Sequence, residues 1–208
     1  MTLVVLVDHD DPVPERFIDQ LPGSVDDVVT VESPGAGRPY RWPDISWGER
    51  VVLIQADGSM SPEDIPHFLY YLDNGFDFVK GSRFIAGGEC GTYPAIRRMG
   101  HRFLLTAARF LYGQQLTDVW YGFCAFRREF LPLLEEQEES PELVGPEIVV
   151  HALHYGLRIA EVPSREAPEA VRKTTARTLR EGRRILRVLW RERPRNAVLR
   201  TATRHRRG

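Results

Sequence analysis

Residues 51–59 read VVLIQADGS, and this stretch decides the fold. Its first four residues are apolar and mostly β-branched, which predicts a short buried strand. Asp57-Gly58 is a turn dipeptide. Ser61, Pro62 and Glu63 follow as residues typical of a helix start: a cap, a proline at the first position and an acid near the positive end of the dipole. The segment therefore predicts a strand, a tight turn and a helix that ends at Gly75, with one apolar face made of Ile65, Phe68, Leu69 and Leu72.

The same alternation continues on both sides of this unit. Further strands are expected at 3–7, 28–31, 76–80, 122–126 and 158–162, and helices at 15–20, 94–112, 146–155 and 175–193. Such alternation predicts an α/β fold, with a mainly parallel sheet flanked by helices and a basic C-terminal helix. In the long helix at 94–112, the residues expected to point inward are Ile96, Met99, Phe103, Leu104, Ala107 and Leu111.

Charged side chains follow four of the expected strands, and they are Asp10, Glu32, Asp57 and Arg83. Ligands of parallel sheets gather at the carboxyl ends of the strands, so we expect these side chains to share one edge. Carboxylates and arginines at such an edge can neutralise a diphosphate, directly or through a divalent cation. Asp57 is the candidate ligand for that cation, although Asp-Gly is also an ordinary turn.

The composition indicates an intracellular globular protein. The 208 residues are 42% apolar, enough for one domain with a sizeable core. No apolar run approaches the length of a membrane span, and the N-terminus turns acidic at once, as in a first strand and unlike a signal peptide. Cys90 and Cys124 form neither a disulfide framework nor a metal-ligand spacing, so we expect a reducing, cytoplasmic location.

The net charge of −1 hides a strong asymmetry, because residues 172–208 hold 14 Lys and Arg against two Asp and Glu. We therefore expect two parts: a domain over 1–171 and a basic amphipathic helix and tail over 172–208. An apolar side with Leu179, Leu186, Leu189 and Trp190 suits an interfacial helix on anionic lipid. Packing against the acidic body, or a contact in a homodimer, accounts for the pattern equally well. Nucleic acid is not expected, because no recognition module accompanies the charge.

Several motifs follow one another between Val52 and Pro163: QADGS at 55–59, FVKGSRF at 78–84, Thr117-Asp118, YGF at 121–123, AFRR at 125–128 and GLRI at 156–159. In order and spacing they resemble family 2 glycosyltransferases of the GT-A fold, which is related to the Rossmann fold. The similarity is to the branch that includes dolichyl-phosphate mannosyltransferase. The resemblance implies transfer of a sugar from a nucleotide-diphosphate donor to a polyprenyl-phosphate or small-molecule acceptor, with Mg²⁺ or Mn²⁺.

The resemblance also implies roles for individual residues. Asp57 matches the last Asp of the family's Asp-x-Asp motif, which contacts the cation and the diphosphate, and Arg83 lies near the donor. Asp118 matches an acidic residue near the acceptor; it is the candidate catalytic base if the acceptor is an alcohol, whereas an ionised phosphate hardly needs one. Glu147 matches a Glu at the start of a helix below the site.

Three departures concern the donor half. Gln55 replaces the first Asp of the motif and supplies no charge, Asp10-Asp11 replaces Asn-Glu, and Glu32 replaces an Asp that holds the base or ribose. In addition, a stretch of about 35 residues that relatives place before the Asp-x-Asp strand is shortened here to the loop at 33–50. These departures favour an alternative: a repurposed fold that catalyses another small-molecule reaction, such as a cyclisation, or that only binds a ligand.

Other candidate residues have competing structural explanations. Trp120 and Tyr121 could form a platform for a sugar or an apolar ligand, although core packing is the commoner use of aromatic residues. Asp118 could cap the turn that follows it. His67, His151 and His154 lie in helical patterns and are not expected to bind a ligand, whereas His9 stays open.

Overall fold

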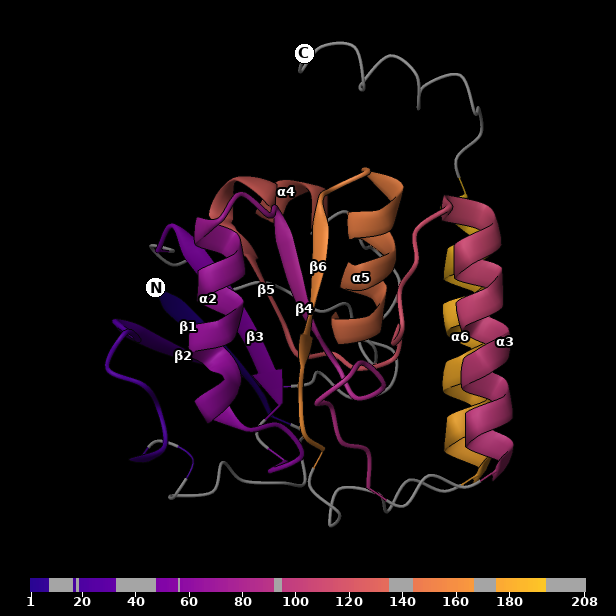
Figure 1. Ribbon diagram of the computed structural model, residues 1–208, viewed down its shortest axis with the longest axis horizontal. Coiled ribbons are helices and arrows are strands. Elements are labelled where there is room, and N and C mark those ends of the chain that lie inside the picture. The colour runs from indigo at the N-terminus through magenta and orange to yellow at the C-terminus, as the bar shows by residue number, and fades with distance from the viewer. Residues whose placement is uncertain are drawn as a thin grey trace.

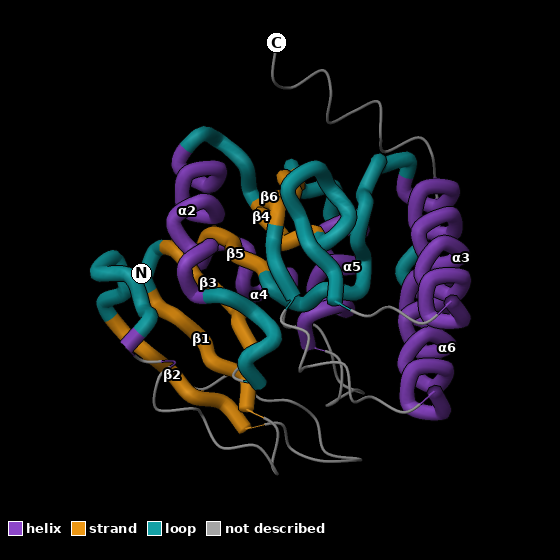
Figure 2. Tube along the Cα trace, turned by 60° about the horizontal axis from the view of Figure 1, so that its bottom comes forward, coloured by secondary structure: helices purple, strands orange, loops and turns teal. Residues whose placement is uncertain are grey.

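The computed structural model describes residues 1–7, 17, 19–32, 48–55, 57–91, 95–134, 144–166 and 175–193. Within them, six strands form one sheet with helices on both faces (Figures 1 and 2). The strands are β1 (Thr2–Val7), β2 (Asp27–Glu32), β3 (Arg50–Gln55), β4 (Phe78–Ser82), β5 (Cys124–Arg127) and β6 (Ile159–Pro163). The α-helices are α2 (Ile65–Asp73), α3 (Ala95–Tyr112), α4 (Leu131–Leu134), α5 (Val144–His154) and α6 (Thr175–Arg191). Two 3-10 turns, η1 (Pro62–Asp64) and η2 (Arg128–Phe130), precede α2 and α4.

The strand order is β2-β1-β3-β5-β4-β6. The pairs β1–β2, β1–β3 and β4–β6 are parallel, whereas β5 is antiparallel to both of its neighbours. The prediction of a mainly parallel sheet is therefore confirmed. Because β5 runs the other way, the chain that enters β5 lies at the same edge as the carboxyl ends of the other strands.

The strands bury side chains on both faces of the sheet. Along β3, Val51 and Leu53 belong to one apolar cluster, and Val52 and Ile54 belong to another. Helix α2 covers the second face, where the rings of Phe68 and Phe123 stack with their centroids 4.2 Å apart. Helices α3, α5 and α6 contribute to the first cluster. Burial on both faces explains why this strand reads as a continuous apolar run in the sequence.

The helical segment after β3 begins where the sequence predicts, but without the predicted cap. Ser61 makes no side-chain capping hydrogen bond. Its carbonyl oxygen accepts the backbone N–H of Asp64 at 3.2 Å, which closes a 3-10 turn, and Pro62 has no N–H that would need a partner. The segment ends as predicted at Gly75, whose φ of +92° favours glycine.

Helices α3 and α6 stand side by side at one end of the molecule (Figures 1 and 2). Leu104, Ala108 and Tyr112 of α3 are buried, and the Tyr112 hydroxyl donates to the carbonyl oxygen of Leu189 in α6 at 3.2 Å. The prediction that Met99 and Phe103 face inward is wrong, because these side chains are 69% and 60% exposed. Helix α3 carries apolar residues on more than one of its faces, so the periodicity of the sequence alone cannot show which face is buried.

Helix α6 packs into the domain. Its Ile185, Val188 and Leu189 are buried in the same cluster as α3 and α5. Leu189 and Trp190 were expected on one side of this helix, but they lie on different sides: Leu189 is buried and Trp190 is 60% exposed. The boundary at residue 172 stays a prediction. Asp10 and half of the helix expected at 15–20 lie outside the described residues, as do 33–47 and 194–208.

No helix within the described ranges combines the length and the hydropathy needed to cross a bilayer.

Candidate functional site

The sheet brings charged residues from four segments to one edge. Asp57 follows β3, Arg83 follows β4, Asp118 lies before β5, and Glu161 and Glu166 lie within and after β6. Glu32 is the last residue of β2 and is in register with Val7 of β1, at this edge. The edge is thus formed by the elements that the sequence reading selected.

Arg83 and Asp118 form a buried ion pair at the centre of this edge. The guanidinium donates through Nε to Asp118 Oδ2 at 2.7 Å and through Nη2 to Oδ1 at 3.2 Å. Its Nη1 donates to Glu166 Oε1 at 2.9 Å. The side chains of Arg83 and Asp118 are 1% and 0% exposed. One guanidinium is therefore held between two carboxylates, an arrangement that fixes its position firmly.

The oxygens of Asp118 are fully engaged. Oδ1 also accepts the backbone N–H groups of Trp120 at 3.0 Å and Tyr121 at 3.2 Å, and His101 Nε2 lies 3.3 Å away. Burial raises the pKa of the Asp118 carboxyl, but the charge of Arg83, with help from His101 and Lys80, outweighs burial and holds this pKa well below 3.8. Asp118 is therefore ionised and weakly basic, and it positions Arg83 and the turn at 118–121.

A second buried layer supports this pair from β4 and β6. The Glu161 carboxylate accepts the N–H of Thr117 at 2.8 Å, the Thr117 hydroxyl at 2.8 Å and the N–H of Asp118 at 3.1 Å. Lys80 Nζ, on the neighbouring strand, lies 3.6 Å from Glu161 and is completely buried. This layer fixes the backbone at Thr117 and Asp118, and thereby the position of the Asp118 side chain.

Sequence reasoning did not assign site roles to Lys80, His101, Glu161 or Glu166. One signal was available: Glu161 and Lys80 are charged residues inside apolar strands, where an unpaired charge would be costly. The pairing of Glu166 with Arg83, 83 residues apart, left no local signal.

Asp57 differs from this buried network because it is exposed. Its Oδ1 accepts the N–H of Ser59 at 2.9 Å in a tight turn, and Gly58 there has a φ of +74°. The Tyr121 hydroxyl donates to the Ser59 carbonyl at 3.4 Å, so the turn rests against the network. A diphosphate-bound Mg²⁺ or Mn²⁺ needs only one or two protein carboxylates, and Asp57 fits the role of a single ligand. Among the described residues, no group of three or more His, Cys, Asp or Glu could hold a metal unaided.

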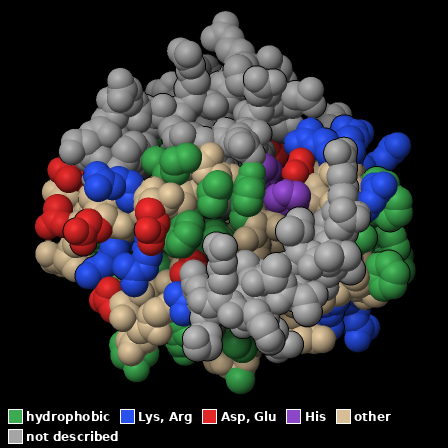
Figure 3. Space-filling view, turned by 90° about the horizontal axis from the view of Figure 1, so that it is seen from above, with side chains coloured by type: hydrophobic (Ala, Val, Ile, Leu, Met, Phe, Trp, Pro, Cys, Tyr) green, Lys and Arg blue, Asp and Glu red, His purple; other side chains and the backbone are tan. Residues whose placement is uncertain are grey.

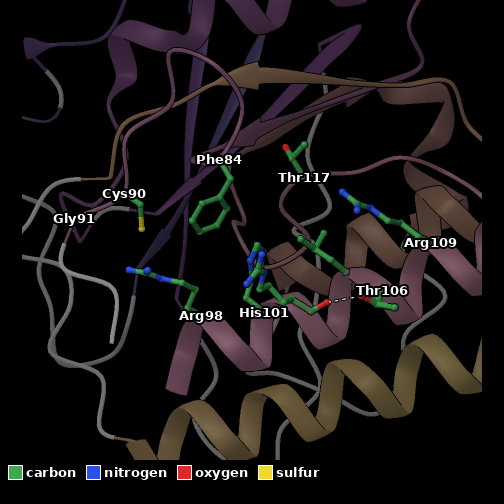
Figure 4. A pocket seen from close by; sticks show the side chains of 10 residues that line it. Phe84, Cys90, Gly91, Arg98, His101, Thr106, Arg109 and Thr117 are labelled. Carbon is green, nitrogen blue, oxygen red and sulfur yellow. Dashed lines mark hydrogen bonds between the residues drawn. The ribbon is translucent and has the colours of Figure 1, made fainter. Parts of the chain in front are cut away.

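A groove of about 700 Å³ opens between the loop after β4 and helix α3 (Figure 4). Its lining is cationic because it holds three arginines, Arg98, Arg102 and Arg109, which lie along the helix with His101; Phe84, Cys90 and Thr117 lie opposite them. Arg109 donates two hydrogen bonds to the Leu116 carbonyl oxygen, so two of its N–H donors are already used within the protein. Arg98 and Arg102 are exposed and form no ion pair within the described part of the chain. The groove is suited to a phosphate-bearing ligand.

The thiol in this groove is not activated. Burial raises the pKa of Cys90 to about 11, although Arg83 opposes this, and the thiol donates to Glu166 Oε2 at 3.4 Å. Cys90 is accordingly a structural contact of Glu166, and no nucleophilic role is indicated.

The candidate cleft residues do not form one platform. Trp120 is buried in the cluster on the α3–α6 face and reaches the backbone of α6, whereas Tyr121 is buried in the cluster on the α2 face. The Arg83 guanidinium carbon lies 4.9 Å from the centroid of the Tyr121 ring, so Tyr121 contacts the network through its ring as well as its hydroxyl.

Glu147 lies away from this network, in α5, where its Oε1 is 3.2 Å from Arg184 Nε of α6. The side chain is 1% exposed. Burial raises its pKa from 4.5 to about 7, against the opposing charges of Arg184 and Arg191. The structure thus places Glu147 at a helix interface instead of in the groove.

This placement gives a pH prediction. Because the folded carboxyl keeps its proton to a higher pH than the unfolded one, the free energy of unfolding should fall as pH rises from 4.5 to about 7. Relative to Glu147→Gln, which cannot ionise, the native protein should lose up to about 3 kcal/mol over this window, measured by urea denaturation at several pH values. Parallel curves for the two proteins would show that Glu147 ionises normally. Glu63→Gln, at an exposed position of η1, serves as the control.

Comparisons with known proteins agree with this geometry. A model of the family described as "Glycosyl transferase family 2" matches residues 45–133. The dolichyl-phosphate hexose transferase of Haloferax volcanii is 32% identical over 168 residues, which are 77% of this chain and 68% of that protein. The polyprenol monophosphomannose synthase of Mycolicibacterium smegmatis is 31% identical over 124 residues, 56% of this chain and 47% of that protein. The chain thus spans about half to two thirds of the length of these relatives.

Solved structures support the fold. Glucosyl-3-phosphoglycerate synthase from Mycobacterium tuberculosis, in complex with Mn²⁺ and UDP-glucose, superimposes with a TM-score of 0.66. The match covers 92% of this chain and 78% of the other at 19% identity. The expected fold class is confirmed.

Proposed function

Since the chain belongs to glycosyltransferase family 2, we propose that it transfers a sugar from a nucleotide-diphosphate donor to a phosphate-bearing acceptor. The observation that carries this proposal is the cationic groove directly beside the Arg83–Asp118 pair. An acceptor phosphate would lie against Arg98 and Arg102, and the donor diphosphate would lie near Asp57 at the end of β3.

The state of Asp118 favours an acceptor that is already ionised. A hydroxyl acceptor needs a general base, whereas Asp118 is completely buried, fully hydrogen-bonded and weakly basic. A phosphate oxygen carries its own negative charge. In the proposed reaction it attacks the anomeric carbon and forms the new C–O bond, while the C–O bond to the diphosphate breaks and the diphosphate leaves with the bonding electrons.

The relatives support a lipid phosphate as the acceptor, since one is described as a dolichyl-phosphate hexose transferase and the other as a polyprenol monophosphomannose synthase. For the donor side, a related fold has been solved with Mn²⁺ and UDP-glucose, and also with Mg²⁺ and UDP. Asp57 would supply the protein's carboxylate to such a cation. The comparisons do not favour a repurposed fold. A cytoplasmic location of the protein stays a prediction.

The test measures donor binding first. Titration calorimetry with UDP and with GDP, with and without Mn²⁺ or Mg²⁺, should show metal-dependent binding of one of them. Incubation with the matching sugar nucleotide and a short-chain polyprenyl phosphate should then yield the glycosylated phosphate, detected by mass spectrometry. A folded protein that binds neither nucleotide and forms no product would overturn the proposal.

A separate prediction concerns the proposed binding of the acceptor phosphate. Arg102→Ala should raise the KM for the polyprenyl phosphate by about 10- to 100-fold, because it removes a charge-assisted contact of about 1.5–3 kcal/mol. Nucleotide affinity should not change. The control is Arg50→Ala, which changes a partly exposed arginine at the opposite edge of the sheet. A loss of nucleotide affinity in Arg102→Ala would place the donor in this groove instead.

A further inference from the structure

Helix α3 carries a stripe of large apolar side chains on its outer face. Met99, Phe103 and Phe110 are exposed, and Phe110 reaches 87%. At about 100° per residue these three positions fall within about 40° of one another around the helix. Leu104, Ala108 and Tyr112, which face the core, lie on the opposite side. The stripe is therefore a continuous surface that the fold leaves uncovered in the described part of the chain.

Basic side chains border this stripe. Arg98, Arg102 and Arg109 lie about 60–100° to one side of it, toward the groove. On the neighbouring helix, Arg183, Arg187 and Trp190 are exposed at spacings of four and three residues, which gives one face. Figure 3 shows the resulting pattern: hydrophobic side chains gather at the edge formed by these two helices, with Lys and Arg side chains on both sides of them.

We infer that this α3–α6 face, defined by Met99, Phe103, Phe110 and the bordering arginines, docks on the surface of an anionic lipid bilayer. Large apolar side chains between arginines are the arrangement with which interfacial helices bind such surfaces. A second copy of the chain would bring the arginines of two identical faces together, and their like charges would oppose the contact.

The inference rests on the proposed function and specifies how the acceptor reaches the site. The cationic groove opens on the flank of α3 next to the stripe, so a docked protein would hold the groove at the level of the lipid phosphates. A lipid-phosphate acceptor could then place its phosphate between Arg98 and Arg102 while its chain stays in the bilayer. The apolar stripe would insert into the bilayer interface, and the arginines would orient the docked protein by pairing with lipid phosphates.

The experiment is flotation of the full chain with lipid vesicles in the absence of nucleotide. The native protein should float with mixed phosphatidylcholine–phosphatidylglycerol vesicles in low salt and only weakly with phosphatidylcholine alone. Phe103→Ser combined with Phe110→Ser should lower the partition coefficient by about tenfold or more, because two exposed aromatic side chains no longer enter the interface. The matched control is Tyr70→Ser, a residue of α2 that is 62% exposed and lies on the other face of the sheet; it should float like the native protein.

Two outcomes would overturn the inference. One is undiminished flotation of the double variant, which would assign membrane binding to other basic residues. The other is failure of the native protein to float, together with a dimer in light scattering that the double variant dissociates, which would assign the stripe to a second copy. Because the assay contains no nucleotide, either failure leaves the calorimetric test of donor binding intact, and a failure of donor binding leaves the flotation result intact.

Discussion

Arg83→Ala should lower the free energy of unfolding by about 3–5 kcal/mol, which makes it one of the most destabilising single substitutions in the chain. The loss follows from the carboxylates left behind: Asp118, which is completely buried, and Glu166, whose side chain is 8% exposed, would face each other with no guanidinium between them. Urea denaturation monitored by circular dichroism measures the change. Sugar transfer should be lost as well, because the turn at 118–121 loses its anchor.

The chain offers a matched control in Arg158. Its guanidinium also binds an aspartate through two hydrogen bonds, to Asp77 at 3.1 and 2.9 Å, but the Arg158 side chain is 55% exposed. Arg158→Ala should therefore cost much less. Arg83→Met together with Asp118→Asn should recover part of the loss, since it removes both charges. Equal effects of Arg83→Ala and Arg158→Ala would mean that the Arg83 pair is not isolated from water.

Asp57→Asn should weaken metal-dependent nucleotide binding by about 10- to 100-fold, with the midpoint of thermal unfolding nearly unchanged. The substitution keeps the Oδ1 atom that accepts the Ser59 N–H, so the turn is preserved while the charge is removed. Calorimetry with the nucleotide in Mn²⁺ measures the affinity. Asp73→Asn, at the far end of α2, is the control for loss of an exposed carboxylate. If Asp57→Asn binds the nucleotide as well as the native protein does, Asp57 is only a turn residue.

Sequence reasoning succeeded where a local pattern has one structural solution. The apolar run at 51–54, the turn at Asp57-Gly58 and the stop at Gly75 each specify their own conformation, and the structure has them all. The shared edge was also predictable, because it follows from strand direction and needs no side-chain detail. The partners of Arg83 were not, because Glu166 reaches it through the packing of the whole sheet.

Two errors share one physical cause. Met99 and Phe103 were expected inside, and Leu189 was expected on the same side of its helix as Trp190. In both helices apolar residues occupy more than one face, and only the neighbouring elements decide which face is buried. Tertiary packing of α3 against α6 made that decision, and it left large aromatic residues outside. Such an exposed apolar surface is itself informative about binding.

The antiparallel course of β5 has a consequence for how such proteins can diversify. The chain leaves the sheet after Arg83, forms the whole of α3 and returns at Asp118, 35 residues later, beside the point where it left. The two ends of this excursion are joined by the buried ion pair and by a 2.6 Å hydrogen bond between Ser82 and Thr117. The solvent-facing surface of the excursion can therefore vary while both of its ends stay in place, whereas Leu104, Ala108 and Tyr112 hold its inner face to the core.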